Sequence, residues 1–77
     1  MWIEEDNKLK REFKFSNYAE ALNFVNKISI GIEELGHHPE ITLTWGRVII
    51  TTTTHDAGNK ITNKDVILTE LINKIYE

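Results

Sequence analysis

Residues 9–15 alternate between hydrophobic and polar side chains, which is the period of a β-strand with one buried face. Residues 2–5 form a second, shorter strand candidate, and the turn-prone pair Asp6-Asn7 lies between the two segments. The start of the chain therefore predicts a β-hairpin. Its longer strand places apolar side chains on one face and charged ones on the other: Leu9, Phe13 and Phe15 against Lys10, Glu12 and Lys14.

From residue 18 the hydrophobic residues recur at three- and four-residue steps, which is the period of one helical face. Asn17, with Glu20 three residues later, resembles a capping box at the start of this helix. Gly36 suits a left-handed C-cap, and Pro39 prevents the helix from continuing. The predicted apolar stripe consists of Tyr18, Ala21, Leu22, Val25, Ile28, Ile32 and Leu35.

The second half of the chain repeats this order of elements. Residues 41–45 alternate between apolar residues and threonines, so Trp45 is expected in the core. Gly46-Arg47 is a turn candidate, and residues 48–54 are rich in β-branched side chains, which favour a strand. After a polar loop, Thr62 and Asp65 form a second capping box. The helix that follows has an apolar stripe of Ile67, Leu68, Leu71, Ile72 and Ile75.

The order ββαββα predicts an α+β fold, in which a four-stranded antiparallel sheet carries two helices packed on one face. The whole chain, residues 1–77, is expected to form a single domain. This architecture leaves one sheet face and at least one edge uncovered unless a second copy covers them. A chain of this size without disulfides often gains stability by association, so we expect a homodimer or a homotetramer.

The composition excludes several classes of function. Nine Lys and Arg against twelve Asp and Glu give a net charge of −3, which argues against a nucleic-acid partner. The longest apolar run has only three residues, so neither a signal sequence nor a membrane span is expected, and the predicted location is cytoplasmic. The chain contains no cysteine, which excludes a thiolate metal site and a cysteine nucleophile.

The three histidines are the main candidates for chemistry. His37 and His38 lie between the first helix and the third strand, and His55 follows the fourth strand. A hairpin with its turn at Gly46-Arg47 brings residue 55 back to the neighbourhood of residues 37–40. Histidine has an ordinary pKa of about 6.5, so facing imidazoles can give and take protons near neutrality.

Less specific interpretations apply to the same residues. A histidine after a helix C-terminus is often a capping or solvated residue, and Asp65 matches a helix-capping carboxylate. Glu33 lies one helical turn before His37, so it could hydrogen-bond an imidazole or simply be solvated. A metal site is not expected, because adjacent histidines seldom bind one ion and the i, i+4 histidine pair of helical zinc sites is missing.

Taken together, Glu33, His37-His38-Pro39, Trp45, His55 and Asp65 have a spacing that resembles the signature of the pterin-4a-carbinolamine dehydratases. This family is also known as the dimerisation cofactor of a homeodomain transcription factor. The resemblance covers essentially the whole chain. It is to a short form of the family, because members usually carry a helix before the first tryptophan and this chain starts at Met1-Trp2.

The resemblance implies a dehydratase that removes water from 4a-hydroxytetrahydrobiopterin to give quinonoid dihydrobiopterin. This reaction recycles the pterin used by aromatic amino-acid hydroxylases, and it needs no metal or organic cofactor. The family fold is a four-stranded antiparallel sheet with helices on one side. Family subunits dimerise by sheet pairing and form tetramers through helices, so the implied partners are a pterin and further copies of the chain.

The resemblance also implies roles for individual residues. His37 and His55 would be the acid–base pair, His38 would bind or orient the substrate, and Glu33 and Asp65 would support them. The pterin would be bound by the backbone around Pro39 and by the segment of Thr54, His55, Asp56 and Ala57. Trp2 could either pack at the end of the sheet or line the pocket.

Two other functions stay open from the sequence. The chain could be a non-catalytic dimerisation or scaffold module, although every histidine of the motif is present. It could also be an enzyme that acts on a different pterin, such as the pterin of the molybdenum cofactor, because the motif would recognise the shared bicyclic ring.

Overall fold

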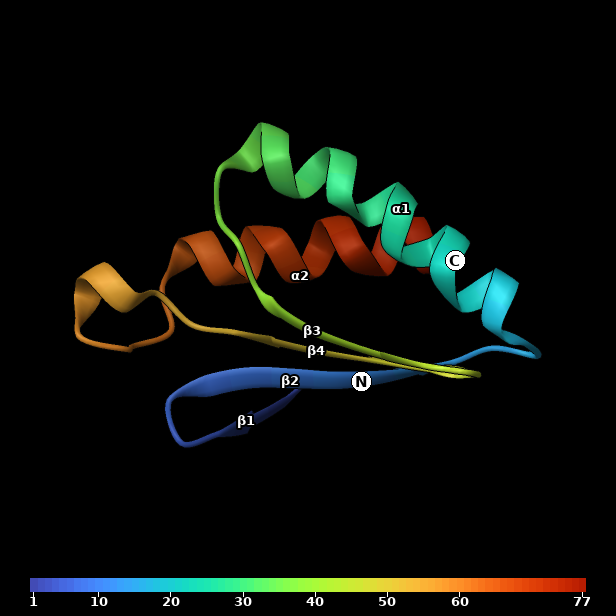
Figure 1. Ribbon diagram of the computed structural model, residues 1–77. Helices are drawn as coiled ribbons and strands as arrows, with labels where there is room; N and C mark the ends of the chain where they lie inside the picture. Colours follow the sequence, from blue (N-terminus) through green and yellow to red (C-terminus); the bar gives the residue numbers. More distant parts are fainter.

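The computed structural model describes residues 1–77 and has the predicted order of elements (Figure 1). A four-stranded antiparallel sheet carries both helices on one face, which confirms the predicted α+β class. Neither helix combines the length and the apolar character needed to cross a bilayer. The elements are β1 (Ile3–Glu5), β2 (Lys8–Lys14), α1 (Tyr18–Leu35), β3 (Glu40–Thr44), β4 (Arg47–Thr52), a 3₁₀ turn η1 (His55–Ala57) and α2 (Asn63–Tyr76).

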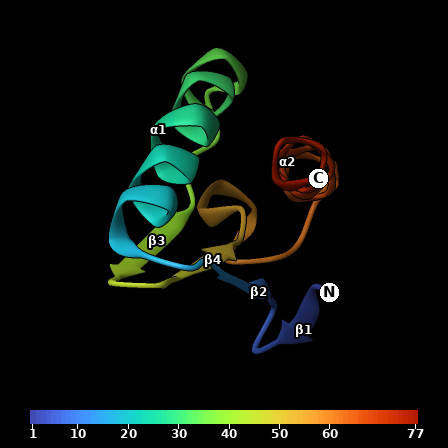
Figure 2. The ribbon, with the colours of Figure 1, turned by 90° about the vertical axis from the view of Figure 1, so that its right-hand side faces the viewer.

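The strands lie in the order β1-β2-β4-β3, so the long strands β2 and β4 are central and the other two are edges. Opposite residues of an antiparallel pair point to the same face. The pairs Phe13↔Val48 and Ile41↔Ile50 therefore share the helix-covered face, whereas the pair Glu40↔Thr51 lies on the open face. Figure 2 shows α1 above the β3 side of the sheet and α2 toward the β1 side.

The hydrophobic core lies between the sheet and the two helices. Phe13 packs against Phe24 and Tyr76 with ring centroids 4.9–5.0 Å apart, and Trp2 meets the edge of Phe13 at 5.9 Å. The fully or nearly fully buried apolar residues are Phe13, Ala21, Phe24, Ile28, Ile32, Val48, Ile50, Leu68 and Ile72.

The expectation that Trp45 belongs to the core is wrong. Trp45 and Gly46 form the two-residue turn beyond the last strand pair, Thr44↔Arg47, and the Trp45 side chain is 73% exposed. The alternation of β3 does not continue into this turn, so the turn geometry rather than the hydrophobic period decides where the indole lies.

The helix ends follow the predicted signals. Asn17 caps α1 through a 2.9 Å hydrogen bond from the Glu20 backbone N–H, while the Glu20 side chain accepts from the backbone of Ser16. Gly36 ends α1 in the left-handed conformation, with φ 72°, and its N–H donates to the carbonyl of Ile32. This cap turns the chain from α1 into the segment that carries His37 and His38.

We predict that Gly36→Ala lowers the free energy of unfolding by about 1 kcal/mol, because a Cβ atom disfavours the left-handed conformation. Gly36→Asn should lose less, since asparagine tolerates this conformation better. Urea denaturation followed by circular dichroism measures both variants. Unchanged stability in Gly36→Ala would contradict a cap held at positive φ.

Candidate functional site

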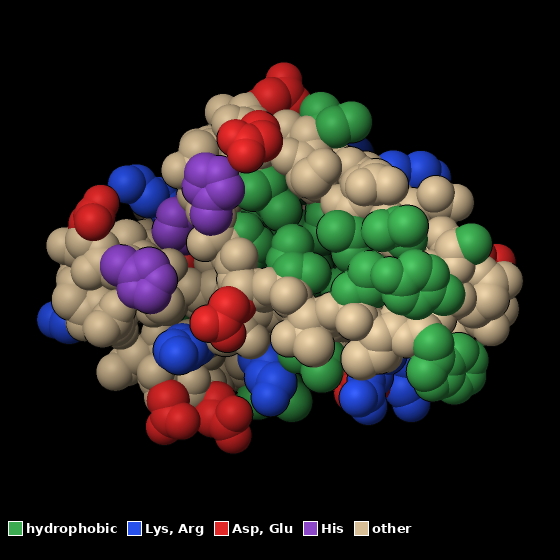
Figure 3. All heavy atoms as spheres, in the orientation of Figure 1, with side chains coloured by type: hydrophobic (Ala, Val, Ile, Leu, Met, Phe, Trp, Pro, Cys, Tyr) green, Lys and Arg blue, Asp and Glu red, His purple; other side chains and the backbone are tan.

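The three histidines gather at one end of the molecule (purple in Figure 3). This end lies away from the β3–β4 turn, because β3 begins and β4 finishes there. The pair Glu40↔Thr51 fixes the register, so the residues just before β3 lie close to those just after β4. The sheet pairing thus brings together segments that are about twenty residues apart in the sequence.

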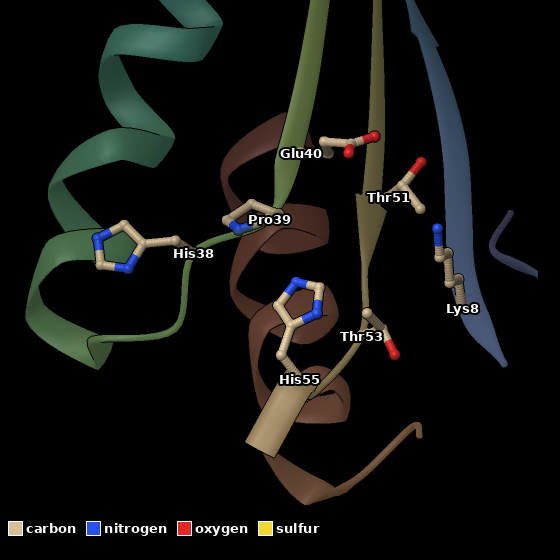
Figure 4. A pocket seen from close by; sticks show the side chains of 7 residues that line it. All are labelled: Lys8, His38, Pro39, Glu40, Thr51, Thr53 and His55. Carbon is tan, nitrogen blue, oxygen red and sulfur yellow. The ribbon is translucent and has the colours of Figure 1, made fainter. Parts of the chain in front are cut away.

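A pocket of about 150 Å³ lies at this end of the sheet (Figure 4). Its residues come from the start of β2, the chain before β3, and the end of β4. The ring of His55 points into the pocket, whereas the ring of His38 is turned toward the end of α1. The pocket is lined by Lys8, His38, Pro39, Glu40, Thr51, Thr53 and His55, with no aliphatic or aromatic side chain apart from the Pro39 ring.

Beside this pocket, the carboxylate of Asp65 is fully buried and accepts hydrogen bonds from four groups. The hydroxyls of Thr52 and Thr54 donate at 2.6 and 2.7 Å, and the backbone N–H of Thr62 donates at 2.9 Å. The Nε2 atom of His37 lies 2.6 Å from Oδ1 of Asp65. One side chain therefore joins the start of α2, the end of β4 and the segment after α1.

Burial alone would raise the pKa of Asp65, but the hydrogen bonds from Thr52, His37, Thr54 and the Thr62 backbone outweigh it and lower the pKa from 3.8 to about 2. Asp65 is consequently ionised at neutral pH and can only accept hydrogen bonds. The Nε2 atom of His37 must then carry the proton in its bond to Asp65, which fixes the orientation of the ring.

The hydrogen-bond partners of the histidines differ from those that the sequence predicted. Asp65, expected mainly as a helix cap, forms the capping box with Thr62 and also holds His37. Glu33 lies near His38 rather than His37, at 3.4 Å from Nε2, and both side chains are more than half exposed. The ring of His55 is held by Asn59, whose Oδ1 lies 2.7 Å from Nδ1.

His37 does not line the pocket with His38 and His55. Its side chain is 12% exposed, and its ring is directed to Asp65 on the helix side of the sheet. Of the three histidines predicted to share one pocket, His38 and His55 line it. His37 does not, and its ring is held by Asp65 instead.

The predicted pterin-binding segment after β4 lies only partly on the pocket. The Thr54 hydroxyl contacts Asp65 and Thr62, and the Thr54 backbone forms an isolated bridge with Lys60, with N···O distances of 2.9 and 3.3 Å. Asp56 and Ala57 lie in η1 and do not line the pocket. Of this segment only His55 does so, because η1 turns the following residues away.

Trp2 packs at the end of the sheet, so the interpretation that it lines the pocket is not supported. Its indole N–H donates to Asn73 at 2.7 Å, and its ring contacts Phe13 on the helix-covered face. The pocket instead contains Lys8, Glu40, Thr51 and Thr53, which sequence analysis missed. Strand alternation could have identified them, because Lys8, Thr51 and Thr53 precede or follow helix-facing residues by one position.

No group of three His, Asp or Glu side chains is placed so that it could hold a metal ion. The side chains at this end of the molecule that could bind a metal are instead hydrogen-bonded to other protein groups, as in the contacts His37–Asp65 and His55–Asn59. The small polar pocket is lined by two imidazoles, one carboxylate, one ammonium group and two hydroxyls, a set suited to proton transfer.

Comparison with known proteins gives a consistent result. The family model described as Pterin 4 alpha carbinolamine dehydratase matches residues 1–75. A Picosynechococcus protein named "Putative pterin-4-alpha-carbinolamine dehydratase" is 47% identical over 64 residues, which cover 83% of this chain and 68% of that protein. The crystal structure of a transcriptional coactivator/pterin dehydratase from Brucella melitensis aligns with a TM-score of 0.91 and 31% identity, covering 99% of this chain and 82% of that one.

A second solved structure shares the fold at lower identity. It is a pterin dehydratase-like protein identified as a RuBisCO assembly factor in the alpha-carboxysome. Its TM-score is 0.79 at 19% identity, and the match covers 99% of this chain and 87% of that one.

We predict that Asp65 contributes roughly 2 kcal/mol of pH-dependent stability, since its pKa is 3.8 in the unfolded chain and about 2 in the folded one. A carboxyl group with a lowered folded pKa stabilises fully above pH 3.8, and this contribution disappears as the pH falls through 2. Asp65→Asn should therefore be less stable at pH 7 and should lose less stability than the wild type on acidification.

Urea denaturation between pH 7 and pH 1.5 measures the difference. Asp56→Asn, at an exposed position on η1, is the matched control and should follow the wild-type pH profile. Parallel pH profiles for the wild type and Asp65→Asn would show that the buried carboxylate does not carry this stability.

Proposed function

The chain belongs to the pterin 4 alpha carbinolamine dehydratase family, and from this premise we propose that it removes water from a 4a-hydroxytetrahydropterin. The membership confirms the resemblance seen in the sequence. The observation that carries the proposal is the polar pocket with His38 and His55, beside a third histidine that an ionised carboxylate holds in place.

The dehydration is a proton-transfer reaction with no oxidant or reductant. The bond between C4a and the hydroxyl oxygen breaks, and the oxygen receives a proton and leaves as water. The N5–H bond loses its proton, and the N5 electrons form the double bond to C4a. One proton is delivered and one is removed, so an acid and a base at two sides of the ring suffice.

We assign these two proton transfers to His37 and His55. A proton-transfer group acts best when its orientation is fixed, and His37 is held by Asp65 with its Nε2 proton in place. Its Nδ1 atom is not engaged by Asp65 and remains to exchange a proton, and the side chain is 12% exposed. His55 points into the pocket from the other chain segment.

His38 and the polar side chains of the pocket are suited to binding rather than proton transfer. The His38 side chain is 62% exposed, and its contact with Glu33 is long at 3.4 Å, so it can reorient around a ligand. The carboxylate of Glu40 can accept hydrogen bonds from the 2-amino group and N3 of a pterin, and the hydroxyl of Thr51 can donate or accept.

Catalysis is tested with a 4a-hydroxytetrahydropterin generated in situ, by following its dehydration. We predict that His37→Ala and His55→Ala each lower kcat by a factor of about 10²–10⁴, because each removes one proton-transfer group. His38→Ala should raise KM more than it lowers kcat. Lys27→Ala, at an exposed position on α1, is the control and should match the wild type.

The same assay distinguishes the alternatives. Wild-type protein that does not accelerate dehydration would disprove the enzyme proposal and leave the non-catalytic scaffold function. A pterin dehydratase-like protein with this fold is identified as a RuBisCO assembly factor, which favours this second candidate. Comparing a biopterin-type substrate with a tetrahydropterin that lacks the 6-side chain shows whether the side chain matters. Equal kcat/KM for the two would indicate that the protein recognises only the bicyclic ring.

A further inference from the structure

Two opposite charges that line the pocket have no ionic partner within the chain. Apart from the histidines, Lys8 and Glu40 are its only ionisable side chains. None of the three ion pairs of the structure involves either residue. Glu5 lies opposite Lys8 in the β1–β2 pair, but no ion pair joins the two. The pocket therefore has an ammonium group and a carboxylate that are both available to a ligand.

Lys8 and Glu40 lie on opposite sides of strand β4. The pair Glu40↔Thr51 places Glu40 beside Thr51, and the β2–β4 register, continued by one residue, places Lys8 beside Thr53. Figure 4 shows Glu40 entering from β3 and Lys8 from β2. Because neighbouring strands are about 5 Å apart, the backbones of the two residues are about 10 Å apart across the sheet. A flat ligand that lies over β4 can therefore contact both charged groups.

The backbone position of Lys8 is fixed by the turn between β1 and β2. Asp6 and Asn7 form this two-residue turn, with φ angles of 53° and 62°. The hydroxyl of Thr53 donates to the carbonyl of Asn7 at 2.9 Å, and Thr53 is 6% exposed. This buried contact fastens the turn to the end of β4. Lys8, which directly follows Asn7, therefore starts from a fixed point beside the pocket.

The charged groups and the imidazole follow one another along β4 in a defined order. Glu40 lies beside Thr51, Lys8 lies beside Thr53, and the ring of His55 points into the pocket beyond them. A pterin presents its groups in a matching order, with the 2-amino group and N3–H first, then O4, then C4a. The carboxylate can thus accept from N3–H while the ammonium group donates to O4. C4a, where water is lost, then lies toward the imidazole.

This pair of charges distinguishes a 4-oxo ring from a 4-amino ring. In a pterin, N3–H donates and O4 accepts, whereas in a 2,4-diaminopteridine N3 accepts and the 4-amino group donates. An ammonium group has three donors and no acceptor, so Lys8 would face the hydrogens of the 4-amino group. A carboxylate only accepts, so Glu40 would face the lone pair of N3. Both contacts are favourable with the 4-oxo ring and unfavourable with the 4-amino ring.

We propose that Lys8 is a specificity residue of this pocket, which donates a hydrogen bond to the 4-oxo group of a 2-amino-4-oxopteridine while Glu40 accepts from N3–H. The ligand class rests on the proposed function, whereas the placement of the two charges does not. Hydrogen bonds to charged groups are stronger than those between neutral groups. Losing them therefore lowers the affinity for the 4-amino analogue by at least about tenfold.

The role of Lys8 is tested by fluorescence titration at pH 7 with two ligands, pterin and 2,4-diaminopteridine. The wild type should bind pterin at least about tenfold more tightly than the diamino compound. Lys8→Gln should lower this preference at least about threefold, because an amide can donate to a 4-oxo group and also accept from a 4-amino group. Lys8→Arg keeps a positive donor and should keep the preference. An unchanged preference in Lys8→Gln would overturn the proposal.

Lys10→Gln is the matched control. Lys10 lies two residues further along the same face of β2, and it lines the neighbouring groove but not the pocket. Lys8 and Lys10 are both exposed, so each glutamine variant should fold, and each removes one positive charge. Lys10→Gln should keep the wild-type preference for pterin. An equal loss of preference in Lys8→Gln and Lys10→Gln would indicate a general effect of charge and would overturn the specific role of Lys8.

A double variant, Lys8→Gln with Glu40→Gln, tests the two charges together. The amide at position 40 can donate to N3 of the diamino compound and still accept from its 2-amino group. The double variant should therefore bind 2,4-diaminopteridine more tightly than pterin. Glu40 is exposed at the edge of the sheet, so the variant should fold, as circular dichroism can show. A wild-type preference for pterin in the double variant would overturn the proposal.

These titrations need no turnover, so they separate the inference from the proposed function. Protein that prefers pterin and loses this preference in Lys8→Gln, but does not dehydrate a 4a-hydroxytetrahydropterin, would disprove only the proposed function. Protein that dehydrates its substrate but keeps the full preference in Lys8→Gln would disprove only the inference. Wild-type protein that binds both ligands equally, or binds neither, would overturn the role of Lys8.

Discussion

The buried carboxylate of Asp65 is the interaction on which the rest of the site depends. It is ionised, fully buried and bonded to groups from β4, from the start of α2 and from the segment after α1. A buried charge is tolerated only when its hydrogen bonds compensate for the lost water. The same bonds that satisfy the charge therefore determine where His37 lies and how its ring is turned.

Local signals in the sequence predicted most of the fold. The period of residues 9–15 gave β2, and the caps at Asn17, Gly36 and Thr62 placed the helix ends within a residue. The turn predicted at Gly46-Arg47 lies one residue earlier, at residues 45–46, but the hairpin still brings His55 back to the end of the sheet where β3 begins, as predicted. These features depend on neighbours in the sequence or on one strand pairing, and such interactions can be inferred from spacing alone.

The details of the site depended on contacts between distant segments, and the sequence did not predict them. Asp65 was recognised as a cap but not as the partner of His37, because no local sequence signal indicates a contact between residues that are 28 positions apart. Trp2 was left between two interpretations until its hydrogen bond to Asn73 placed it in the packing. Trp45 was misassigned, because a turn interrupts the strand period at that residue.

The short bridge between Thr54 and Lys60 closes the base of the loop that carries His55. Because the loop is sealed there, an added or deleted residue among positions 56–59 would be absorbed within it and would not displace β4 or the start of α2. The imidazole at the base of the loop would keep its place as long as Asn59, which holds its ring, is retained while the other residues of the loop change. Natural or engineered sequence changes next to the site can therefore be accommodated in this segment without displacing the sheet and the helix that hold it.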